Sequence, residues 1–540
     1  MSTSELPADG IGRPWRPKLR ATFSARTLSS EGWIVCGLVL LAAAIRILVI
    51  DNQSFWADEA LTAYEARLPF GGMINVVLHV ETTPPLYFVL IWAWGHILGT
   101  SEVALRSLST LAGIAVVPIA YLCGRDLASR RVGVIAAAFV AVNPFLIWYS
   151  QEARAYMLLV ALSGASFLWF IRARREPSRR NLAWWTACSS LALMTHFFAG
   201  FLVAAEALWL LWVARTRLVA GAVAVVVIVE VAMLPFAFLD SSHGAGWIAA
   251  EPRVNRVSQA ISEWGVSILY RRTTIAAGLI GGAVLVALVA LLAVVGGDRR
   301  SRRAAAVGAA VGGFVWVAPL ALHYVGQDYF LSRNVMPAVV PLAVALAAAC
   351  AAPRARVLGG ALAVALLLMF AFAAVRVQSH PYLQRPDWRA VARALGPATV
   401  PRAIFASDGT TANPLKIYLA GVDWTEPPGR RLWIREIDVV GATKRLTLVP
   451  TRLTGPRALL EGPYEYQSGP SVPRSVAPAG ARLLSRFRLD NWILARFVLR
   501  RPIRVSIDQM MGLAPRFFRR VPSQLLLFFQ PPGADERAAR

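Results

Sequence analysis

Residues 54–87, SFWADEALTAYEARLPFGGMINVVLHVETTPPLY, decide how the chain is interpreted. The acidic pair Asp58–Glu59 stands near the start of this stretch, and Glu81 precedes Pro84–Pro85 near its end. The stretch directly follows the first long apolar segment, Gly32–Ile50. Ionisable groups beside a membrane span are costly and therefore point to function by default. We expect a functional site at the rim of a membrane.

Composition indicates an integral membrane protein. Of the 540 residues, 56% are apolar, more than in typical soluble domains. The apolar residues gather in blocks of roughly 15–25, the length that crosses hydrocarbon as a helix. The net charge of +25 comes largely from arginines in short loops between these blocks, where they orient the protein and face lipid phosphate. This distribution argues against nucleic acid and makes the lipid bilayer the expected partner.

About eleven membrane spans are predicted, with the N-terminus in the cytoplasm and the C-terminus outside. Residues 1–31 are polar and basic and are expected to form a disordered cytoplasmic tail. Beyond Ile171 the basic loops do not alternate cleanly unless a segment such as Gly200–Val213 is re-entrant or a span is miscounted. The predicted spans are Gly32–Ile50, Val103–Leu122, Val132–Trp148, Arg154–Ile171, Leu182–Phe198, Gly200–Val213, Leu218–Leu239, Thr274–Val295, Ala304–Tyr324, Val335–Ala352 and Val357–Val377.

The first outer loop is predicted to hold helices that lie at the membrane interface. Pro84–Leu98 is apolar and rich in tryptophan, but about fifteen residues are short for a crossing. If it crossed, the basic loop Arg125–Arg131 would lie outside, against the positive-inside rule. We therefore expect three interfacial helices, Asp58–Arg67, Leu68–Val80 and Pro84–Leu98.

Past residue 378 the hydrophobicity falls, and the chain changes character. We expect a small α/β domain at 378–540 on the extracytoplasmic side, within the usual domain size. The fold class is thus an all-α polytopic membrane domain, residues 32–377, followed by this α/β domain. The predicted strands are Arg402–Ala406, Arg431–Val440, Arg482–Phe487 and Gln524–Phe529, and the predicted helices are Trp388–Leu395 and Asn413–Leu419.

Two acidic sites lie in the first outer loop. If Asp58 begins a helix, Asp58, Thr62 and Glu65 share one of its faces. The plain alternative is that carboxylates in a first turn only stabilise the helix dipole. The second site is Glu81, for which the plain alternative is a helix cap before Pro84.

Two further groups of polar residues are predicted on the same outer side. Glu152, Arg154 and Tyr156 lie at the outer end of the third span, where the plain alternative is a weak interfacial ion pair. The sequence Gln327-Asp328-Tyr329-Phe330-Leu331-Ser332-Arg333 follows a later span. Carboxylates and arginines that converge there suit the binding of a phosphate and the activation of a hydroxyl.

Four motifs in this order carry a family resemblance. They are Phe55-Trp-x-Asp-Glu-Ala60, Glu81-x-x-Pro-Pro-Leu-Tyr87, Gly99-Thr-Ser-Glu-x-x-Leu-Arg106 and Gln151-Glu-Ala-Arg-x-Tyr156. The chain resembles the polyprenyl-phosphate-sugar-dependent glycosyltransferases of the GT-C superfamily over about residues 32–377. It is most similar to the family 39-like group, which includes protein O-mannosyltransferases, aminoarabinose transferases and Rgt-type transferases. Several relatives have a lysine just before the proline pair, where this chain has Thr82-Thr83.

The resemblance implies transfer of a sugar, with inversion, from a polyprenyl phosphate to an envelope glycan, lipid or protein at a bacterial plasma membrane. It implies Asp58 as general base, with Glu59 beside it in the catalytic pair. Phosphate contacts would come from Arg154 or Arg333 in place of the missing lysine. No cofactor is required, although a divalent cation is compatible because relatives differ in this respect. The implied substrate-binding residues are Glu81, Tyr87, Glu152, Arg154, Tyr156, Tyr329 and Arg333.

Two other functions compete with this interpretation. A transporter or flippase for lipid-linked sugars would use charges at the membrane midplane, broken helices and internal repeats. Only Glu206 and Glu230 are candidates for such charges, and a buried hydrogen bond is the plain explanation for both. A non-catalytic scaffold that binds envelope polymer is the third possibility.

Overall fold

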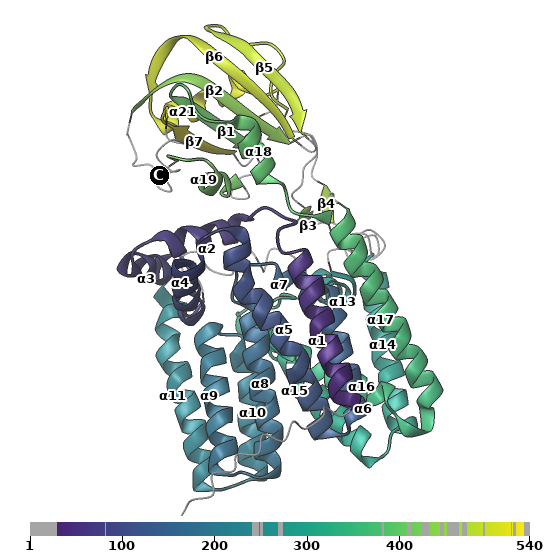
Figure 1. Ribbon diagram of the computed structural model, residues 1–540. Helices are drawn as coiled ribbons and strands as arrows, with labels where there is room; N and C mark the ends of the chain where they lie inside the picture. Colours follow the sequence, from purple (N-terminus) through teal and green to yellow (C-terminus); the bar gives the residue numbers. More distant parts are fainter. Residues whose placement is uncertain are drawn as a thin grey trace, which may run out of the picture.

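The computed structural model shows a bundle of long helices that carries a sheet-containing domain on one end (Figure 1). We call this end of the bundle the domain end. Of the basic tail predicted at 1–31, residues 1–29 lie outside the described residues. The structure describes residues 30–81, 83–239, 248, 252–267, 274–380, 383–407, 412–422, 431–442, 448–450, 464–466, 472–489, 492–519, 521 and 525–533.

Seven helical segments in the described part of the chain are long and apolar enough to cross a membrane. They are α1 (Ser30–Leu48), α5 (Glu102–Leu127), α8 (Tyr156–Arg175), α11 (Arg217–Leu239), α14 (Ile275–Leu291) with η3 (Leu292–Gly296), α15 (Arg299–Leu322) with η4 (His323–Val325), and α17 (Arg356–Ser379) with η6 (Pro353–Ala355). The bent pair α6 (Arg130–Val142) and α7 (Pro144–Ser150) makes an eighth crossing if it is one span.

Shorter helices complete the bundle. They are α9 (Arg179–Thr195), α10 (Ala199–Val213), α13 (Arg253–Val266), η5 (Met336–Ala338) and α16 (Val339–Cys350). Helix α10 runs without interruption over its 15 residues, and a re-entrant segment there stays a prediction. The multi-pass helical architecture is confirmed, whereas the count of about eleven spans remains a prediction.

The span predicted at Val132–Trp148 is not one straight helix. Helix α6 ends at Val142, and α7 begins at Pro144 after a bend of 56°. Because a residue before proline avoids the helical conformation, Asn143 is extended, with φ −62° and ψ 122°. The proline then occupies the first turn of α7, where a missing N–H group costs little.

A buried arginine stabilises this break. The Arg46 guanidinium donates to the carbonyl oxygens of Ala141 at 2.8 Å and Val140 at 3.2 Å, which lie at the last turn of α6. It also donates to Ser150 Oγ at 3.0 Å. Carbonyls at a helix end need such partners. Arg46 therefore ties α1 to both halves of the broken helix and fixes where the chain leaves α7 at the domain end.

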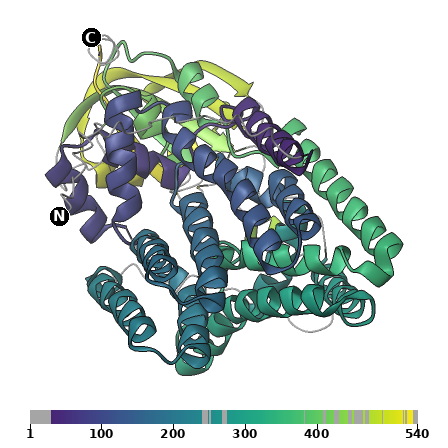
Figure 2. The same cartoon turned by 60° about the horizontal axis from the view of Figure 1, so that its bottom comes forward.

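Three short helices of the first loop lie at the domain end, under the sheet-containing domain (Figures 1 and 2). They are α2 (Ala57–Arg67), α3 (Phe70–His79) and α4 (Leu86–Leu98), close to the predicted segments. Helix α4 has 13 residues, which is too short to cross hydrocarbon. It ends at Gly99, whose φ of +87° favours glycine.

The C-terminal part contains a five-stranded mixed sheet in the order β5-β6-β2-β1-β7, in which only β1 and β2 pair in parallel. Helices α18 and α19 pack on one face of this sheet, and α21 packs on the other. A separate pair, β3 and β4, is antiparallel. The bounds are α18 (Trp388–Leu395), β1 (Arg402–Ser407), α19 (Leu415–Tyr418), β2 (Leu432–Ala442), β3 (Leu448–Pro450), β4 (Tyr464–Tyr466), β5 (Ala481–Leu489), β6 (Trp492–Val505), α21 (Ile507–Phe517) and β7 (Leu525–Gln530).

Polar contacts fix this domain to the first loop. Arg389 Nη1 lies 2.7 Å from both Asp51 Oδ1 and Glu102 Oε2. The Tyr418 hydroxyl donates to Glu102, and its ring stacks on Phe55 with centroids 6.2 Å apart. The domain thus rests on the segment that leads directly into α2.

Candidate active site

Glu59 is fully buried and bound by charged and backbone donors. Both Arg106 Nε and Arg106 Nη2 donate to its carboxylate at 2.8 Å, and the Ala153 N–H donates at 2.9 Å. Burial opposes ionisation, but the adjacent Arg106 brings the pKa of Glu59 below its ordinary value. This carboxylate therefore joins α2 to α5 and to the loop before α8.

Arg106 also shapes the chain ahead of α2. Its guanidinium donates to the carbonyl oxygens of Ile50, Gln53 and Ser54 at 3.1, 2.7 and 3.1 Å. A planar guanidinium can serve several acceptors in fixed directions. Arg106 and Glu59 together hold the first turn of α2, which also carries Asp58.

Asp58 has a different environment from its neighbour. Its side chain is half-buried, and its carboxylate has no hydrogen bond or ion pair with any residue that the structure describes. Burial disfavours the charge of Arg154, but Glu81, Asp58 and Tyr156 raise its pKa well above the ordinary value. The charge of Asp58 likewise helps to raise the pKa of Arg333. A carboxylate without a cation partner thus lies within electrostatic reach of two guanidinium groups.

Glu81 and Arg154 form a buried bidentate pair. The Nη1–Oε1 and Nη2–Oε2 distances are 2.7 and 2.8 Å. Arg154 also donates to Thr62 Oγ1 at 3.1 Å and lies over the Phe88 ring, 5.6 Å from its centroid. Beside this pair, Glu65 is fully buried, and burial together with the charge of Glu81 raises its pKa well above the ordinary value.

Glu152 lies between α7 and α8 and is nearly fully buried. Burial raises the pKa of Glu152 to about 7, although Arg385 opposes this rise. Its Oε1 atom accepts a hydrogen bond from Arg385. Its Oε2 atom is buried and has no partner among the described residues. Near neutral pH this carboxyl group can hold or release a proton.

The remaining predicted residues differ in how close they lie to this region. Arg333 lies over the Tyr156 ring, 5.9 Å from its centroid. Tyr87 is fully buried behind Arg154. Tyr329 is farther out, where its ring lies 6.1 Å from that of Phe198.

Asp328, which was expected to join the other acidic groups, pairs instead with Arg256. The Nη1–Oδ1 and Nη2–Oδ2 distances are 2.7 and 2.6 Å. It is thus neutralised away from Asp58, between α13 and the loop after α15. Of the predicted polar stretch Gln327–Arg333, Arg333 contributes to the site, and Asp328 does not.

Comparisons with known proteins bear on the family and the fold. Residues 82–239 match the sequence model of the family described as dolichyl-phosphate-mannose-protein mannosyltransferase. The crystal structure of ArnT from Cupriavidus metallidurans bound to undecaprenyl phosphate aligns with a TM-score of 0.50 at 14% identity, over 87% of this chain and 98% of that chain. The predicted GT-C fold is confirmed.

Other GT-C structures overlap with the chain over shorter lengths. The Saccharomyces cerevisiae protein O-mannosyltransferase Pmt1-Pmt2 complex bound to the sugar donor covers 39% of this chain and 33% of that chain, at 17% identity and a TM-score of 0.31. The Archaeoglobus fulgidus oligosaccharyltransferase in complex with Zn and sulfate covers 67% and 55%, at 16% identity and a TM-score of 0.41. No curated protein matches the sequence.

Three residues of the candidate site were absent from the predicted set. Arg106 belongs to a quoted motif and is a charge within an apolar helix, a signal that could have placed it in the site. Glu65 shares the predicted α2 face with Asp58 and could have been included on that ground. Arg385 follows the last helix of the bundle, and nothing in its local sequence indicates a contact with residues more than 200 positions earlier.

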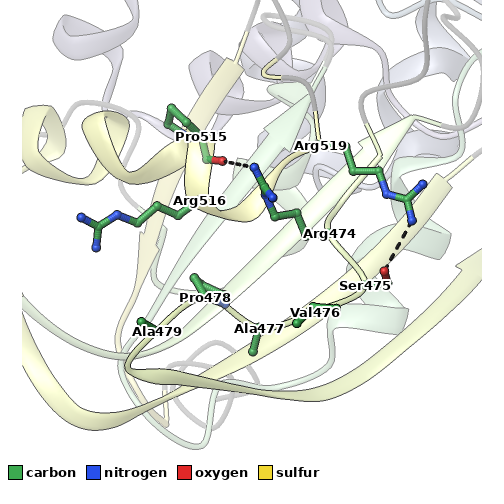
Figure 3. A pocket seen from close by; sticks show the side chains of 9 residues that line it. All are labelled: Arg474, Ser475, Val476, Ala477, Pro478, Ala479, Pro515, Arg516 and Arg519. Carbon is green, nitrogen blue, oxygen red and sulfur yellow. Dashed lines mark hydrogen bonds between the residues drawn. The ribbon is translucent and has the colours of Figure 1, made fainter.

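A separate hollow of about 630 Å³ lies in the C-terminal domain (Figure 3). None of the predicted site residues lines it. Its arginines are partly engaged within the domain, since Arg474 donates to the Pro515 carbonyl and Arg519 to Ser475 Oγ. The lining residues are Arg474, Ser475, Val476, Ala477, Pro478, Ala479, Pro515, Arg516 and Arg519.

Proposed function

We propose that this protein is a membrane glycosyltransferase that moves a sugar from a polyprenyl-phosphate donor to an envelope glycan, lipid or protein. The observation that carries the proposal is the partner-free carboxylate of Asp58. It lies on the first turn of α2, which the Glu59–Arg106 pair holds, within electrostatic reach of Arg154 and Arg333. The family match over residues 82–239 supports the same reaction class.

Asp58 acts as the general base in this mechanism. It accepts the proton of the acceptor hydroxyl while the acceptor oxygen attacks the anomeric carbon. The bond between that carbon and the phosphate oxygen breaks, and its electron pair stays on the phosphate. A carboxylate is a weak base, which suffices when proton transfer is late and the sugar is cation-like. A single displacement inverts the anomeric configuration.

Guanidinium groups receive the leaving phosphate. Arginine suits this task because its planar fork matches phosphate oxygens. Arg154 is already bound by Glu81 through two hydrogen bonds. We assign the neutralisation of the leaving phosphate to Arg154 and Arg333 together. These two residues take the place of the lysine that several relatives have before the proline pair.

Buried polar atoms provide contacts for the sugar. Glu152 Oε2, Gln151 Oε1 and Trp56 Nε1 are buried and have no partner among the described residues. Buried polar groups are normally hydrogen-bonded, and sugar hydroxyls offer both donors and acceptors. The rings of Tyr156 and Tyr329 flank this region. Glu59, Glu81 and Tyr87 support the geometry from behind.

We propose that catalysis needs no resident cofactor. Among the described residues, no cluster of three or more His, Cys, Asp or Glu side chains is arranged to hold a metal ion. Glu59, Glu81 and Glu152 each already face an arginine. The carboxylate of Asp58 leaves a divalent cation compatible with the site.

We place the reaction on the extracytoplasmic face of a bacterial plasma membrane, with the N-terminus in the cytoplasm. Glu31, at the start of α1, pairs with Arg130 at the start of α6 at 2.8 Å. The start of α1 and the basic loop Arg125–Arg131 therefore share the end of the bundle opposite the domain end. The tendency of basic loops to stay in the cytoplasm supports a C-terminal domain on the outside.

The test compares two aspartates of the same loop. Asp58→Asn removes the base and should lower transfer by roughly 10²–10⁴-fold. Asp51→Asn is the control, because Asp51 pairs with Arg389 and lies outside the site. Detergent-solubilised protein is assayed with radiolabelled polyprenyl-phosphate mannose, arabinose or glucose and an envelope acceptor fraction. Wild-type rates from the Asp58→Asn protein, or no transfer from any of the donors, would overturn the proposal.

A further inference from the structure

Arg385 enters the site from the C-terminal side of the chain. It lies between α17 and α18, in the segment that connects the bundle to the sheet-containing domain. Its Nη1 atom lies 3.3 Å from Glu59 Oε2, and its Nη2 atom donates to Glu152 Oε1. Its backbone N–H donates to Gln53 Oε1 at 3.1 Å. One residue thus contacts both carboxylates that flank Asp58.

Two tryptophans enclose the Arg385 guanidinium. Its central carbon lies 4.8 Å from the ring centroids of both Trp56 and Trp148. Aromatic faces attract a guanidinium, and the attraction grows when water is excluded. The side chain of Arg385 is only 12% exposed. Carboxylates and rings from α2, α7 and the loop before α8 therefore form a fitted pocket for this one cation.

Arg385 opposes the factors that would neutralise Glu152. Burial is the largest of these factors, and the charges of Glu59 and Asp58 add to it. Arg333 is the second cation that acts on Glu152, and it lies over Tyr156 on the other side. Tyr149 and Tyr156 also face this carboxyl group. Without Arg385, Glu152 would keep its proton at neutral pH.

We propose that Arg385 is a positioning residue for the transfer reaction, which favours the ionised form of Glu152 and holds its Oε2 toward the sugar. The inference rests on the proposed function and extends it, because it makes the C-terminal domain part of the active site. An ionised Glu152 accepts a hydrogen bond from a sugar hydroxyl, and Arg385 acts only through this carboxylate.

A neighbouring arginine provides the matched control. Arg389 lies four residues farther along, in α18, and contacts the same loop, but its partners are Asp51 and Glu102. Arg389→Gln weakens docking without touching Glu152. Arg385→Lys keeps the charge and loses the planar fork. Comparing the changes at Arg385 with the change at Arg389 separates a general effect of docking from a specific effect on Glu152.

The first measurement is the pH profile of transfer in the full-length protein. We expect the wild-type rate to fall on the acid side with a midpoint near 7, and this limb to be absent in Glu152→Gln. Arg385→Gln should move the midpoint upward by about one unit or more, since an adjacent cation lowers a carboxyl pKa by about 1–3 units. Arg385→Lys should restore most of the shift, and Arg389→Gln should keep the wild-type midpoint. An unchanged midpoint in Arg385→Gln, or an equal shift in Arg389→Gln, overturns the inference.

The second measurement does not depend on activity. The melting temperature of the protein is compared with that of its Glu152→Gln variant at each pH, with and without the Arg385→Gln change. A carboxyl group with a raised folded pKa loses stability as pH rises from its unfolded pKa through its folded one. Arg385→Gln should extend this loss to higher pH, and no change overturns the inference. If the extension appears but no donor is used, the proposed function fails while the control of Glu152 by Arg385 is supported.

Discussion

Buried carboxylates occur in two regions of this molecule, and their partners differ in kind. At the domain end, Glu59 and Glu81 each meet an arginine at 2.7–2.8 Å. In the middle of the bundle, Glu206 is equally buried but accepts hydrogen bonds from Ser166 and from Trp185 Nε1, the latter at 2.9 Å. Cations therefore pair with the buried carboxylates at the domain end, and neutral donors satisfy Glu206 in the interior.

This difference separates the competing functions. A transporter or flippase would place its charged residues near the membrane midplane. The Glu206 cluster instead joins α8, α9 and α10, since Ser166 also lies 2.8 Å from Ser189. Interhelical hydrogen bonds of this kind stabilise helix packing in membranes. The comparison supports a bundle that serves as a scaffold and a site that lies at its domain end.

The largest effect is expected when a cation that pairs with a buried carboxylate at the domain end is removed. Arg106→Gln leaves Glu59 as a buried carboxylate without its main partner. Breaking a buried pair on one side costs about 3–5 kcal/mol, so we expect a severe loss of folded protein. Thermal unfolding in detergent measures this, and Asp58→Asn is the control that should unfold like wild type. If Arg106→Gln is as stable as that control, the Glu59–Arg106 pair does not hold α2 in place.

Glu65 sharpens the comparison because it is an exception at the domain end. Burial and the adjacent Glu81 raise its pKa, so the folded protein binds a proton at Glu65 that the unfolded chain has released. Its contribution to stability is complete below the ordinary value of about 4.3 and falls as pH rises through the raised pKa, by at most about 1.4 kcal/mol per pH unit. Glu65→Gln should remove this part of the pH dependence. The measurement is the melting temperature as a function of pH, and parallel curves for the two proteins would contradict the prediction.

Hydrophobic pattern and loop charge predicted most of the fold. Helix α18 has the predicted bounds, Trp388–Leu395, and α2 begins one residue before the predicted start. These elements follow from local sequence, because periodic apolar residues decide them. The break at Asn143–Pro144 was missed although proline marks it. The apolar pattern continues through the break, and a pattern does not show that Arg46 is present to satisfy the freed carbonyls.

The candidate site was predictable only where its residues lie in recognisable motifs. The placement of Asp58, Glu81 and Arg154 at one end follows from counting spans. Their pairing does not, because it depends on which side chains meet after the helices pack. Arg385 lies far from all of them in sequence and gives no local signal. Contacts across several hundred residues require the folded chain.

The smallest expected effect tests the other side of the comparison. Glu206→Gln keeps an amide oxygen that can accept from Ser166 and Trp185, so the neutral hydrogen bonds survive. A typical intramolecular hydrogen bond contributes about 1 kcal/mol, and we expect the stability to change by less than that. Transfer activity should stay near the wild-type rate, because Glu206 lies in the interior of the bundle, away from the carboxylates at the domain end. Glu206→Ala is the matched variant, since it leaves the Trp185 N–H and Ser166 without an acceptor and should lower the melting temperature clearly. A Glu206→Gln protein that folds normally but loses transfer would mean that the reaction needs a charge in the middle of the bundle, and the distinction between scaffold and site would fail.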